Sequence, residues 1–355
     1  MNSPIVSIIV PVYNPPRELF HQCISSIQEA MRLVPIDSVE CILVNDGSTE
    51  SYVDEMLKAF DDRFRYIKKD NEGVSIARNL GMKQASGKYL MFVDADDWIE
   101  QNTLQYCLKM IDDSQADIIY MSHVNGGCCL KKPQWQKSIE GEDDIRQFII
   151  DMTAGNAEAS HHGINIYSVW AKLYRKKLIE NIRLQFDPEL KVAEDFWFNL
   201  HALASPYCKS LYYSNQLIYH YVYNGKSVLR SYSDIRVRMS ILFLNRLEGF
   251  SHSCMDCSPK FEKAIRYQLL KSIKISMRTY FLHPMNKMSL SRKYQELQEY
   301  LGEPIMQRLI RKLSWHDGRN RKEYRDIFLL KIHFYWIHLL TEPIMRIIKT
   351  QKVVL

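Results

Sequence analysis

Short apolar runs alternate with amphipathic segments along the first half of the chain. Runs rich in β-branched and aromatic residues predict strands at residues 5–12, 39–44, 65–67 and 89–93. Between them, apolar side chains recur at helical spacing after Pro15-Pro16 and again from Val74 to about Ser86. Strands that alternate with helices through short connections predict an α/β fold with a doubly wound, mostly parallel sheet.

The alternation continues less regularly to about residue 232. The pattern predicts helices at 104–111 and 145–152, strands at 116–121, 210–213 and 218–223, and an irregular excursion at 123–142. From Asp234 onward the chain is poor in Gly and keeps helical spacing, which predicts a helical C-terminal extension. We therefore expect three parts: residues 1–105 and 106–232 as two halves of one catalytic domain, and residues 233–355 as the extension.

The last apolar segment, from Ile327 to Leu340, predicts one continuous, aromatic-rich helix. Basic residues precede it and follow it, namely Arg319, Arg321, Lys322, Arg325, Arg346, Lys349 and Lys352. Basic flanks around such a helix are typical of an anchor that lies in a membrane interface. The alternative is a helix packed on the catalytic domain with its charges in solvent. If the helix is an anchor, a chain cut near Gly318 should stay soluble and active.

Composition places the charge in that same region. The 355 residues carry a net charge of +6, but residues 305–355 alone contain eleven Lys/Arg against four Asp/Glu. The remainder is therefore nearly neutral, which argues against a nucleic-acid partner. Eight scattered Cys and the lack of both a signal peptide and a run of ~18 apolar residues predict a cytoplasmic protein, peripheral at the inner face of the plasma membrane.

Three carboxylates end the strand at residues 89–93. Asp94, Asp96 and Asp97 follow it within four positions, and open α/β sheets bind ligands at the carboxyl ends of their strands. Carboxylates this close repel one another, and a hard cation such as Mg²⁺ or Mn²⁺ relieves that repulsion and bridges to phosphates. The segment predicts a metal–diphosphate site. An acidic helix start is the alternative, because Asp favours N-caps and first turns.

The phosphate-binding loops of other nucleotide enzymes are missing. Neither G-x-G-x-x-G after the first strand nor G-K-[ST] occurs. A diphosphate would thus be neutralised by metal instead of by a glycine-rich loop, and this weakens a dehydrogenase or ATPase interpretation.

Four segments in order and spacing resemble the inverting glycosyltransferases of family 2, which have a GT-A-type fold. They are residues 6–14 (VSIIVPVYN), 44–49 (VNDGST), 71–79 (NEGVSIARN) and 92–98 (FVDADDW). Residues 168–175 (SVWAKLYR) and 194–198 (EDFWF) match further family segments. The resemblance implies a transferase of hexosyl or N-acetylhexosaminyl groups from a nucleotide-diphosphate sugar, with UDP as the expected nucleotide.

The resemblance also implies roles for individual residues. It makes Asp94-Ala95-Asp96 the DxD motif, with Asp94, Asp96 and Asp97 at an Mn²⁺ or Mg²⁺ ion, and it has Asp46 accept a hydrogen bond from the base. The other donor-binding residues that it implies are Pro11, Tyr13, Asn14, Asn71, Arg78, Asp94, Ala95, Asp96 and Lys172.

Glu194 and Asp195 are the predicted catalytic pair. They open an apolar helix, and a helix N-terminus stabilises carboxylate charge, so that Asp195 is suited to take a proton from an acceptor hydroxyl. On this local pattern alone the better interpretation is that they cap the helix, and it is the resemblance that favours catalysis. The implied acceptor is a saccharide or lipid-linked saccharide in capsule, O-antigen or exopolysaccharide assembly.

One position departs from the family. Val222 stands where an Arg near the diphosphate is expected, and Lys226 or Arg230 could substitute. The neighbouring His220 is either a further metal ligand or a structural strand residue. The rival functions are a nucleotidyltransferase, for which residues 15–18 lack a basic signature, and a sugar-nucleotide-binding protein without catalysis.

Overall fold

The computed structural model describes residues 3–57, 63–125, 134–223 and 232–341. The chain divides into two compact units. Unit 1 consists of Met1–Met152, Asn156–Glu189 and Ala193–Asn224, and unit 2 of Thr153–Gly155, Leu190–Val192 and Gly225–Leu355. All predicted site residues lie in unit 1.

Unit 1 begins with four parallel strands in the order β3-β2-β1-β4. They are β1 (Val6–Val12), β2 (Val39–Asp46), β3 (Phe64–Lys69) and β4 (Tyr89–Phe92), and the helices α1 (Arg17–Arg32), α2 (Ser51–Leu57) and α3 (Val74–Gln84) alternate with them. This alternation agrees with the elements expected from the sequence. Parallel strands end at a common edge, so the polar residues that follow β1, β2 and β4 are brought together.

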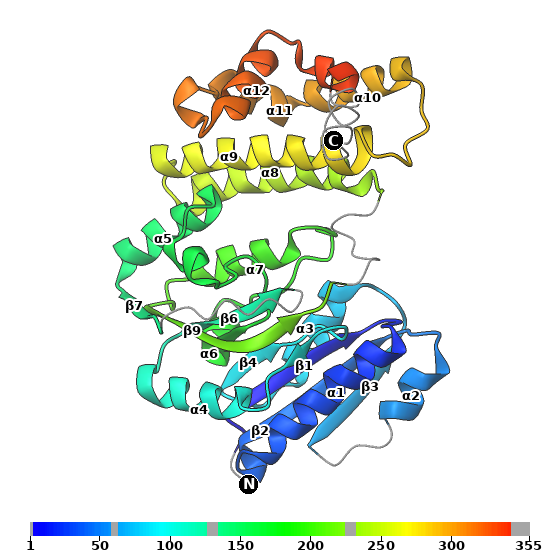
Figure 1. Cartoon of the computed structure of the whole chain (residues 1–355). Coiled ribbons are helices and arrows are strands. Elements are labelled where there is room, and N and C mark those ends of the chain that lie inside the picture. Colours follow the sequence, from blue (N-terminus) through cyan, green and yellow to red (C-terminus); the bar gives the residue numbers. More distant parts are fainter. Residues whose placement is uncertain (1–2, 58–62, 126–133, 224–231, 342–355) are drawn as a thin grey trace, which may run out of the picture. The chain divides into compact units, whose positions relative to one another are not determined.

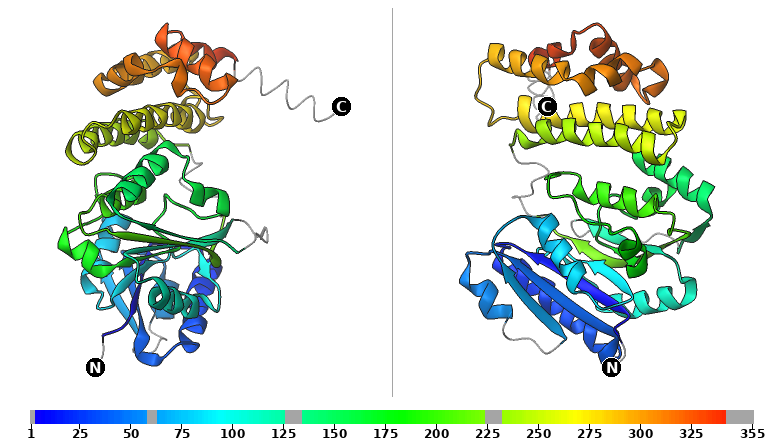
Figure 2. Two further views of the ribbon diagram at one scale, coloured as in Figure 1. Left: turned by 90° about the vertical axis from the view of Figure 1, so that its left-hand side faces the viewer. Right: turned by 180° about the vertical axis from the view of Figure 1, so that it is seen from behind.

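Helices α1 and α3 lie on opposite faces of these strands (Figures 1 and 2). Ile8 and Val10 of β1 share a core cluster with Phe20 and Ile24 of α1. Their neighbour Ile9 points the other way, because side chains alternate along a strand. A Cβ on Gly81 of α3 would lie 2.4 Å from the Ile9 Cγ2 atom, so glycine lets α3 approach the sheet closely.

The second half of the sheet is mixed. It continues in the order β4-β8-β6-β9-β5, and β7 pairs with β9. The strands are β5 (Trp98–Ile99), β6 (Ile118–Asn125), β7 (Gln136–Glu140), β8 (Lys172–Arg175) and β9 (Ser210–Tyr221), with helices α4 (Thr103–Ser114), α5 (Glu142–Ala154), α6 (Lys176–Asn181) and α7 (Glu194–Leu203). The predicted α/β class is confirmed, and antiparallel β8 joins the parallel half to the pair β6 and β9.

Two local predictions in this half are wrong. The two strands expected at 210–213 and 218–223 form the single strand β9, which continues because an irregularity in its pairing with β6 absorbs the change of register near Ser122. The excursion at 123–142 contains the end of β6 and all of β7, whose polar side chains are mostly exposed at the edge of the sheet. Residues 126–133 of the excursion lie outside the described residues.

Unit 2 is helical, as expected. It contains α8 (Ile235–Cys254), α9 (Pro259–Ser276), α10 (Leu290–Gly302), α11 (Pro304–Lys312) and α12 (Arg321–Lys331). Helices α8 and α9 run side by side (Figure 2). Their buried faces contribute Leu244, Leu247, Phe261, Leu269 and Ile273, each at most 1% exposed.

The continuous helix expected from Ile327 to Leu340 does not form. Helix α12 ends at Lys331, His333 has a left-handed backbone (φ 56°), and a short 3₁₀ turn, Tyr335–Ile337, follows. The left-handed backbone at His333 interrupts the helical path, and Ile327, Leu330 and Leu339, on either side of it, are all buried. Arg346, Lys349 and Lys352 lie outside the described residues. Within the described part of the chain, no helix combines the length and the apolarity that crossing a membrane requires.

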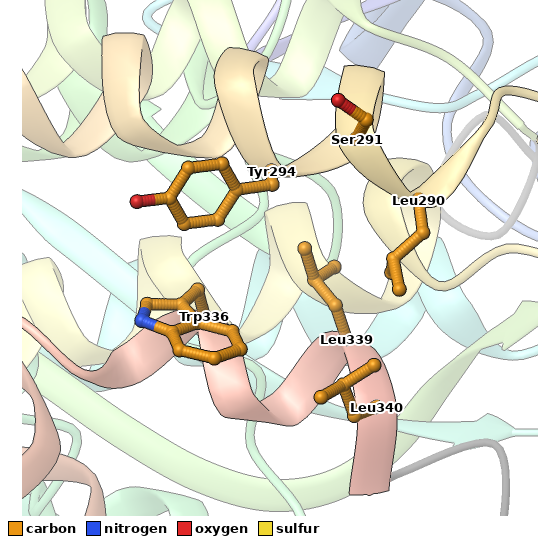
Figure 3. A pocket seen from close by; sticks show the side chains of 6 residues that line it. All are labelled: Leu290, Ser291, Tyr294, Trp336, Leu339 and Leu340. Carbon is orange, nitrogen blue, oxygen red and sulfur yellow. The ribbon is translucent and has the colours of Figure 1, made fainter.

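An apolar pocket lies between α10 and residues 336–340, in the 3₁₀ turn and just after it. Figure 3 shows Tyr294 and Leu290 on one side and Trp336, Leu339 and Leu340 on the other. Its lining contains none of the predicted site residues.

Candidate active site

The turn that follows β4 is fastened to β9. The Asp97 amide donates to the Asp94 carbonyl at 3.1 Å and closes the turn. The Tyr219 hydroxyl of β9 accepts from the Asp94 amide at 3.1 Å and donates to the Asp97 Oδ2 atom at 2.6 Å. One tyrosine thus holds both ends of the acidic turn, a role that no local sequence pattern indicates.

Asp97 does not fit the metal role predicted for it. Its side chain is 1% exposed, and its second oxygen accepts from the Val222 amide at 2.8 Å. Burial, together with the charge of Asp94, raises the pKa of Asp97 to about 8. Both oxygens face β9 because the turn rotates this side chain inward. Asp94 and Asp96, by contrast, remain partly exposed, with buried Ala95 between them.

Arg78 joins the acidic turn to the N-terminus of α7. Its Nη2 atom lies 2.9 Å from the Asp94 Oδ1 atom, and its Nη1 atom lies 2.7 Å from the Asp195 Oδ1 atom. The side chain is 4% exposed and packs on the Phe186 ring. Burial alone would lower the pKa of the guanidinium, but the charges of Asp195 and Asp94 outweigh it and raise the pKa. Arg78 therefore positions carboxylates, and it does not fit the direct donor contact predicted for it.

Asp195 and Glu194 lie in the first turn of α7. Asp195 accepts from the Val169 amide at 3.2 Å through Oδ2, and its side chain keeps 20% exposure. Burial raises its pKa despite the opposing charge of Arg78, so that it holds a proton more readily than an ordinary Asp. Glu194 is farther from Arg78, at 3.7 Å, and burial with the charge of Asp195 raises its pKa to about 7.

Two buried polar side chains hold the segment that contacts Asp195. Lys172 is fully buried, and its amine donates to the carbonyl of Asn165 at 2.6 Å and to that of Ser168. Asn199 of α7 donates to the Tyr167 carbonyl at 2.8 Å and accepts from the Tyr174 hydroxyl at 2.6 Å. The donor contact predicted for Lys172 does not fit, because its amine is enclosed behind this segment. Burial lowers the pKa of Lys172 to about 7.

Asp46 anchors the loop between β3 and α3. Its carboxylate accepts from the amides of Glu72 (3.0 Å) and Gly73 (2.8 Å) and pairs with Lys69 at 2.7 Å. Gly47 has a left-handed backbone, and a Cβ there would lie 2.7 Å from the Asn71 nitrogen. Asp46 and exposed Asn71 therefore lie close together, and the described contacts of Asp46 are with this loop.

The end of β1 meets the turn after β2. The Asn14 Oδ1 atom accepts from the Thr49 amide at 2.9 Å, and the Asn14 amide donates to the Ser48 hydroxyl at 3.1 Å. Asn14 has a left-handed backbone (φ 42°), and its neighbour Tyr13 is 54% exposed. Pro11 is the last but one residue of β1, so the predicted loop is brought to the same sheet edge as Asp46.

The donor set fits a metal that is shared with a ligand. The described residues contain no group of three or more His, Cys, Asp or Glu side chains arranged to hold an ion by themselves. Mg²⁺ commonly takes one or two protein carboxylates and completes its shell with phosphate oxygens and water. Asp96 and the partly exposed Asp94 are the carboxylates of the turn that fit such a site.

His220 has a structural environment. Its ring stacks on Trp98 with centroids 3.5 Å apart, and its Nε2 atom lies 2.5 Å from the Glu100 Oε1 atom. The Val222 amide, as described above, holds Asp97. Lys226 and Arg230, the predicted substitutes for the missing Arg, lie outside the described residues.

The amino-acid sequence is similar to those of known proteins. The family model described as "Glycosyl transferase family 2" matches residues 7–183, about half of the chain. The putative glycosyltransferase EpsH of Bacillus subtilis is 31% identical over 238 residues, which are 65% of this chain and 64% of EpsH. The glycosyltransferase GlyG of Streptococcus pneumoniae is 24% identical over 94% of this chain and 97% of its own length. The chain spans 56% of EpsJ, a further B. subtilis relative.

Solved structures share the fold. S. aureus TarS 1–349 superposes with a TM-score of 0.64 at 18% identity, covering 96% of this chain and 91% of TarS 1–349. Crystals of that TarS fragment also contain UDP or UDP-GlcNAc. This likeness confirms the predicted fold class.

Proposed function

The chain belongs to glycosyltransferase family 2 through residues 7–183, and on this premise we propose that it is an inverting transferase that moves a sugar from a UDP-sugar to an acceptor hydroxyl. The observation that carries the proposal is the row of side chains Asp94, Arg78 and Asp195, joined by contacts of 2.9 and 2.7 Å. It connects the acidic turn after β4 with a partly exposed carboxylate at the N-terminus of α7.

The donor side of the site is the edge formed by the ends of β1, β2 and β4. Tyr13 and Asn71 are exposed there, beside the loop that Asp46 holds. The TarS fragment binds UDP and UDP-GlcNAc on a similar fold, which supports a uridine nucleotide for this chain. A hexosyl or N-acetylhexosaminyl group is the proposed cargo.

The proposed reaction transfers one proton, forms one bond and breaks another. Asp195 accepts the proton of the acceptor hydroxyl while the hydroxyl oxygen attacks the anomeric carbon. The bond between that carbon and the diphosphate oxygen breaks on the opposite face, so the configuration inverts. Arg78 and the Val169 amide hold Asp195 in one orientation, and fixed geometry supplies a large part of the rate.

Asp96 and Asp94 would hold an Mn²⁺ or Mg²⁺ ion. A bound divalent ion supplies Lewis-acid stabilisation of the departing diphosphate. Tyr219 and Asp97 keep the turn in one conformation and so present the two outer carboxylates together.

The acceptor is proposed from the relatives. GgaB of B. subtilis, which is 28% identical over 53% of this chain, is named as a minor teichoic acid biosynthesis protein. We place this chain likewise in cell-surface polysaccharide assembly, with a saccharide or lipid-linked saccharide acceptor at the inner face of the membrane.

The test is donor turnover by the purified full chain. We expect hydrolysis of a UDP-sugar to the free sugar and UDP, stimulated by Mn²⁺ and abolished by EDTA. The change Asp96→Asn keeps the shape of the side chain but removes its charge, and we expect at least a ~100-fold loss, the scale of removing a key electrostatic group. Full turnover in EDTA would contradict the metal role. Release of UTP and sugar 1-phosphate from the UDP-sugar and added pyrophosphate would instead indicate a nucleotidyltransferase.

A further inference from the structure

In and around helix α12, the acidic side chains are buried and the basic side chains are exposed. Between residues 311 and 341 the carboxylates are Asp317, Glu323 and Asp326, and each is at most 7% exposed. The Lys and Arg side chains of the same stretch are all exposed: Arg311, Lys312, Arg319, Arg321, Lys322, Arg325 and Lys331. The surface charge of this stretch is therefore positive throughout.

Two of the buried carboxylates pair with basic side chains of α9, and the third lies beside a histidine. Asp317 pairs with Arg266 of α9 at 2.8 Å, and Glu323 pairs with Lys274 of α9 at 2.8 Å. Asp326 lies 3.2 Å from the buried His338. Two outer cations share an acid, since Arg325 lies 3.4 Å from Asp326 and Lys312 lies 3.5 Å from Glu262. The electrostatic potential outside α12 is therefore set by the exposed basic side chains.

The same face carries large apolar side chains. Tyr324, Phe328 and Ile332 recur at intervals of four residues, which places them on one face at the exposed side of α12, and they are 42%, 47% and 49% exposed. Trp315, 52% exposed, stacks on Phe328 with ring centroids 6.3 Å apart. We call Trp315, Tyr324, Phe328 and Ile332 the aromatic patch. Arg321 and Lys331 share its helical spacing, so charge and apolar surface are interleaved.

We propose that the aromatic patch and the basic side chains around it bind the surface of an anionic lipid bilayer. Tyr and Trp favour the headgroup level, and exposed Phe and Ile insert just below it. Lys and Arg at the same depth attract anionic headgroups. A soluble acidic polymer would satisfy the cations but not the apolar side chains, and the combination therefore favours a membrane.

This surface replaces the anchor expected from the sequence. That expectation placed the apolar contact on one helix from Ile327 to Leu340, but Ile327 and Leu339 are core residues here. The proposal does not rest on the transfer reaction, because binding is measured with lipid alone.

The experiment is sedimentation of the purified full chain with vesicles. We expect binding to vesicles of phosphatidylglycerol mixed with phosphatidylcholine and little binding to phosphatidylcholine alone. High salt should weaken the binding without abolishing it, because screening acts on the charges and not on the apolar contact. No binding of the folded chain to the anionic vesicles would overturn the proposal.

Two matched pairs of variants separate the contributions. Arg321→Gln/Lys322→Gln/Lys331→Gln should weaken binding at low salt at least ~10-fold, whereas Lys83→Gln/Lys88→Gln/Lys177→Gln, the same loss of exposed charge in unit 1, should not. Tyr324→Ser/Phe328→Ser should remove the salt-resistant remainder, whereas Ile36→Ser/Tyr207→Ser, which are even more exposed in unit 1, should leave it. Equal losses in a pair would overturn the assignment to α12.

Two further measurements complete the test. Circular dichroism establishes that each variant is folded, and donor hydrolysis should be unchanged in all four. If the α12 variants instead convert an oligomer to a monomer and leave vesicle binding intact, the patch is a contact between copies of the chain and the proposal fails.

Discussion

The acidic side chains of the site differ in how far they are exposed. Asp195 has two close partners and 20% exposure, whereas Asp97 has two close partners and almost none. Both are acids near Asp94, but only Asp195 keeps the exposure that its proposed contact with the acceptor requires. Their roles follow from exposure, which neighbouring positions in the sequence do not reveal.

Replacing Asp195 tests the proposed base. Asp195→Asn keeps the size of the side chain but cannot take a proton, so we expect transfer to fall at least ~100-fold, within the range of general-base catalysis. Affinity for UDP should change by only a few-fold. Glu194→Gln is the matched control, since Glu194 lies 3.7 Å from Arg78 and should be the less sensitive position. Titration calorimetry that shows lost UDP binding in Asp195→Asn would move this residue to the donor side.

Replacing Asp46 tests the donor loop. Asp46→Asn loses the ion pair with Lys69 and weakens the hydrogen bonds from the Glu72 and Gly73 amides. In the proposed function this loop binds the nucleotide in ground and transition states alike, so the KM for the donor should rise more than kcat falls. Steady-state kinetics with a UDP-sugar measure both constants. An unchanged KM would remove the loop from the donor site.

At the scale of elements, α7 and the segment 165–169 act as one piece. Lys172 and Asn199 hold the carbonyls of this segment, and the Val169 amide holds Asp195. A neutral amine has two N–H groups, which match the two carbonyls that Lys172 contacts. Above its pKa of about 7, Lys172 therefore holds this segment without a buried positive charge.

The change Lys172→Met tests this piece through pH. The unfolded Lys keeps its proton to about pH 10, whereas the folded one loses it above about 7, so the unfolded state binds more protons in between. The contribution of Lys172 to stability therefore rises from pH 7 to 10 and is lost as the pH falls through about 7. Urea unfolding should show this rise, up to ~1.4 kcal/mol per pH unit, in the wild type but not in the variant.

The same variant carries a kinetic readout. A looser segment should lower kcat through Asp195 and leave the KM for the donor unchanged. Parallel pH profiles of stability for the two proteins would show that Lys172 remains charged when buried.

At the scale of the whole molecule, the C-terminal helices are core as well as surface. Glu323, Ile327 and Leu330 of α12 are buried within unit 2 on one side, while the aromatic patch is exposed on the other. The helix therefore cannot be removed without opening the core of unit 2.

A chain cut after Gly318 tests this. The expectation from sequence was a soluble, active fragment, but loss of Ile327 and Leu330 and of the Glu323 partner of Lys274 should destabilise unit 2. Removing one such Leu or Ile side chain commonly costs 2–5 kcal/mol, so we expect a loss of roughly 5 kcal/mol or more. Calorimetry should show a lowered or missing transition. An unchanged thermogram would mean that α12 contributes no packing.

The sequence by itself determined the helices and strands of residues 1–105 and the positions of the motifs in them. Strand and helix periodicities are local, and runs such as Val6–Val12 and Val74–Gln84 therefore predicted their structures. Because parallel strands end at a common edge, the alternation of strands and helices also predicted that Asp46 and Asp94 share that edge. The family resemblance then indicated the reaction.

Only the tertiary structure decided which of these residues meet. Arg78 and Asp195 are 117 positions apart, and Tyr219 and Asp97 are 122 apart, so their contacts depend on where the sheet places α3 and α7 and on the pairing of β9. The same applies to residues 311–341, where burial of Asp317, Glu323 and Asp326 leaves one basic, apolar face. Local patterns specify periodicity, but the direction of each side chain depends on register and packing between segments far apart in the chain.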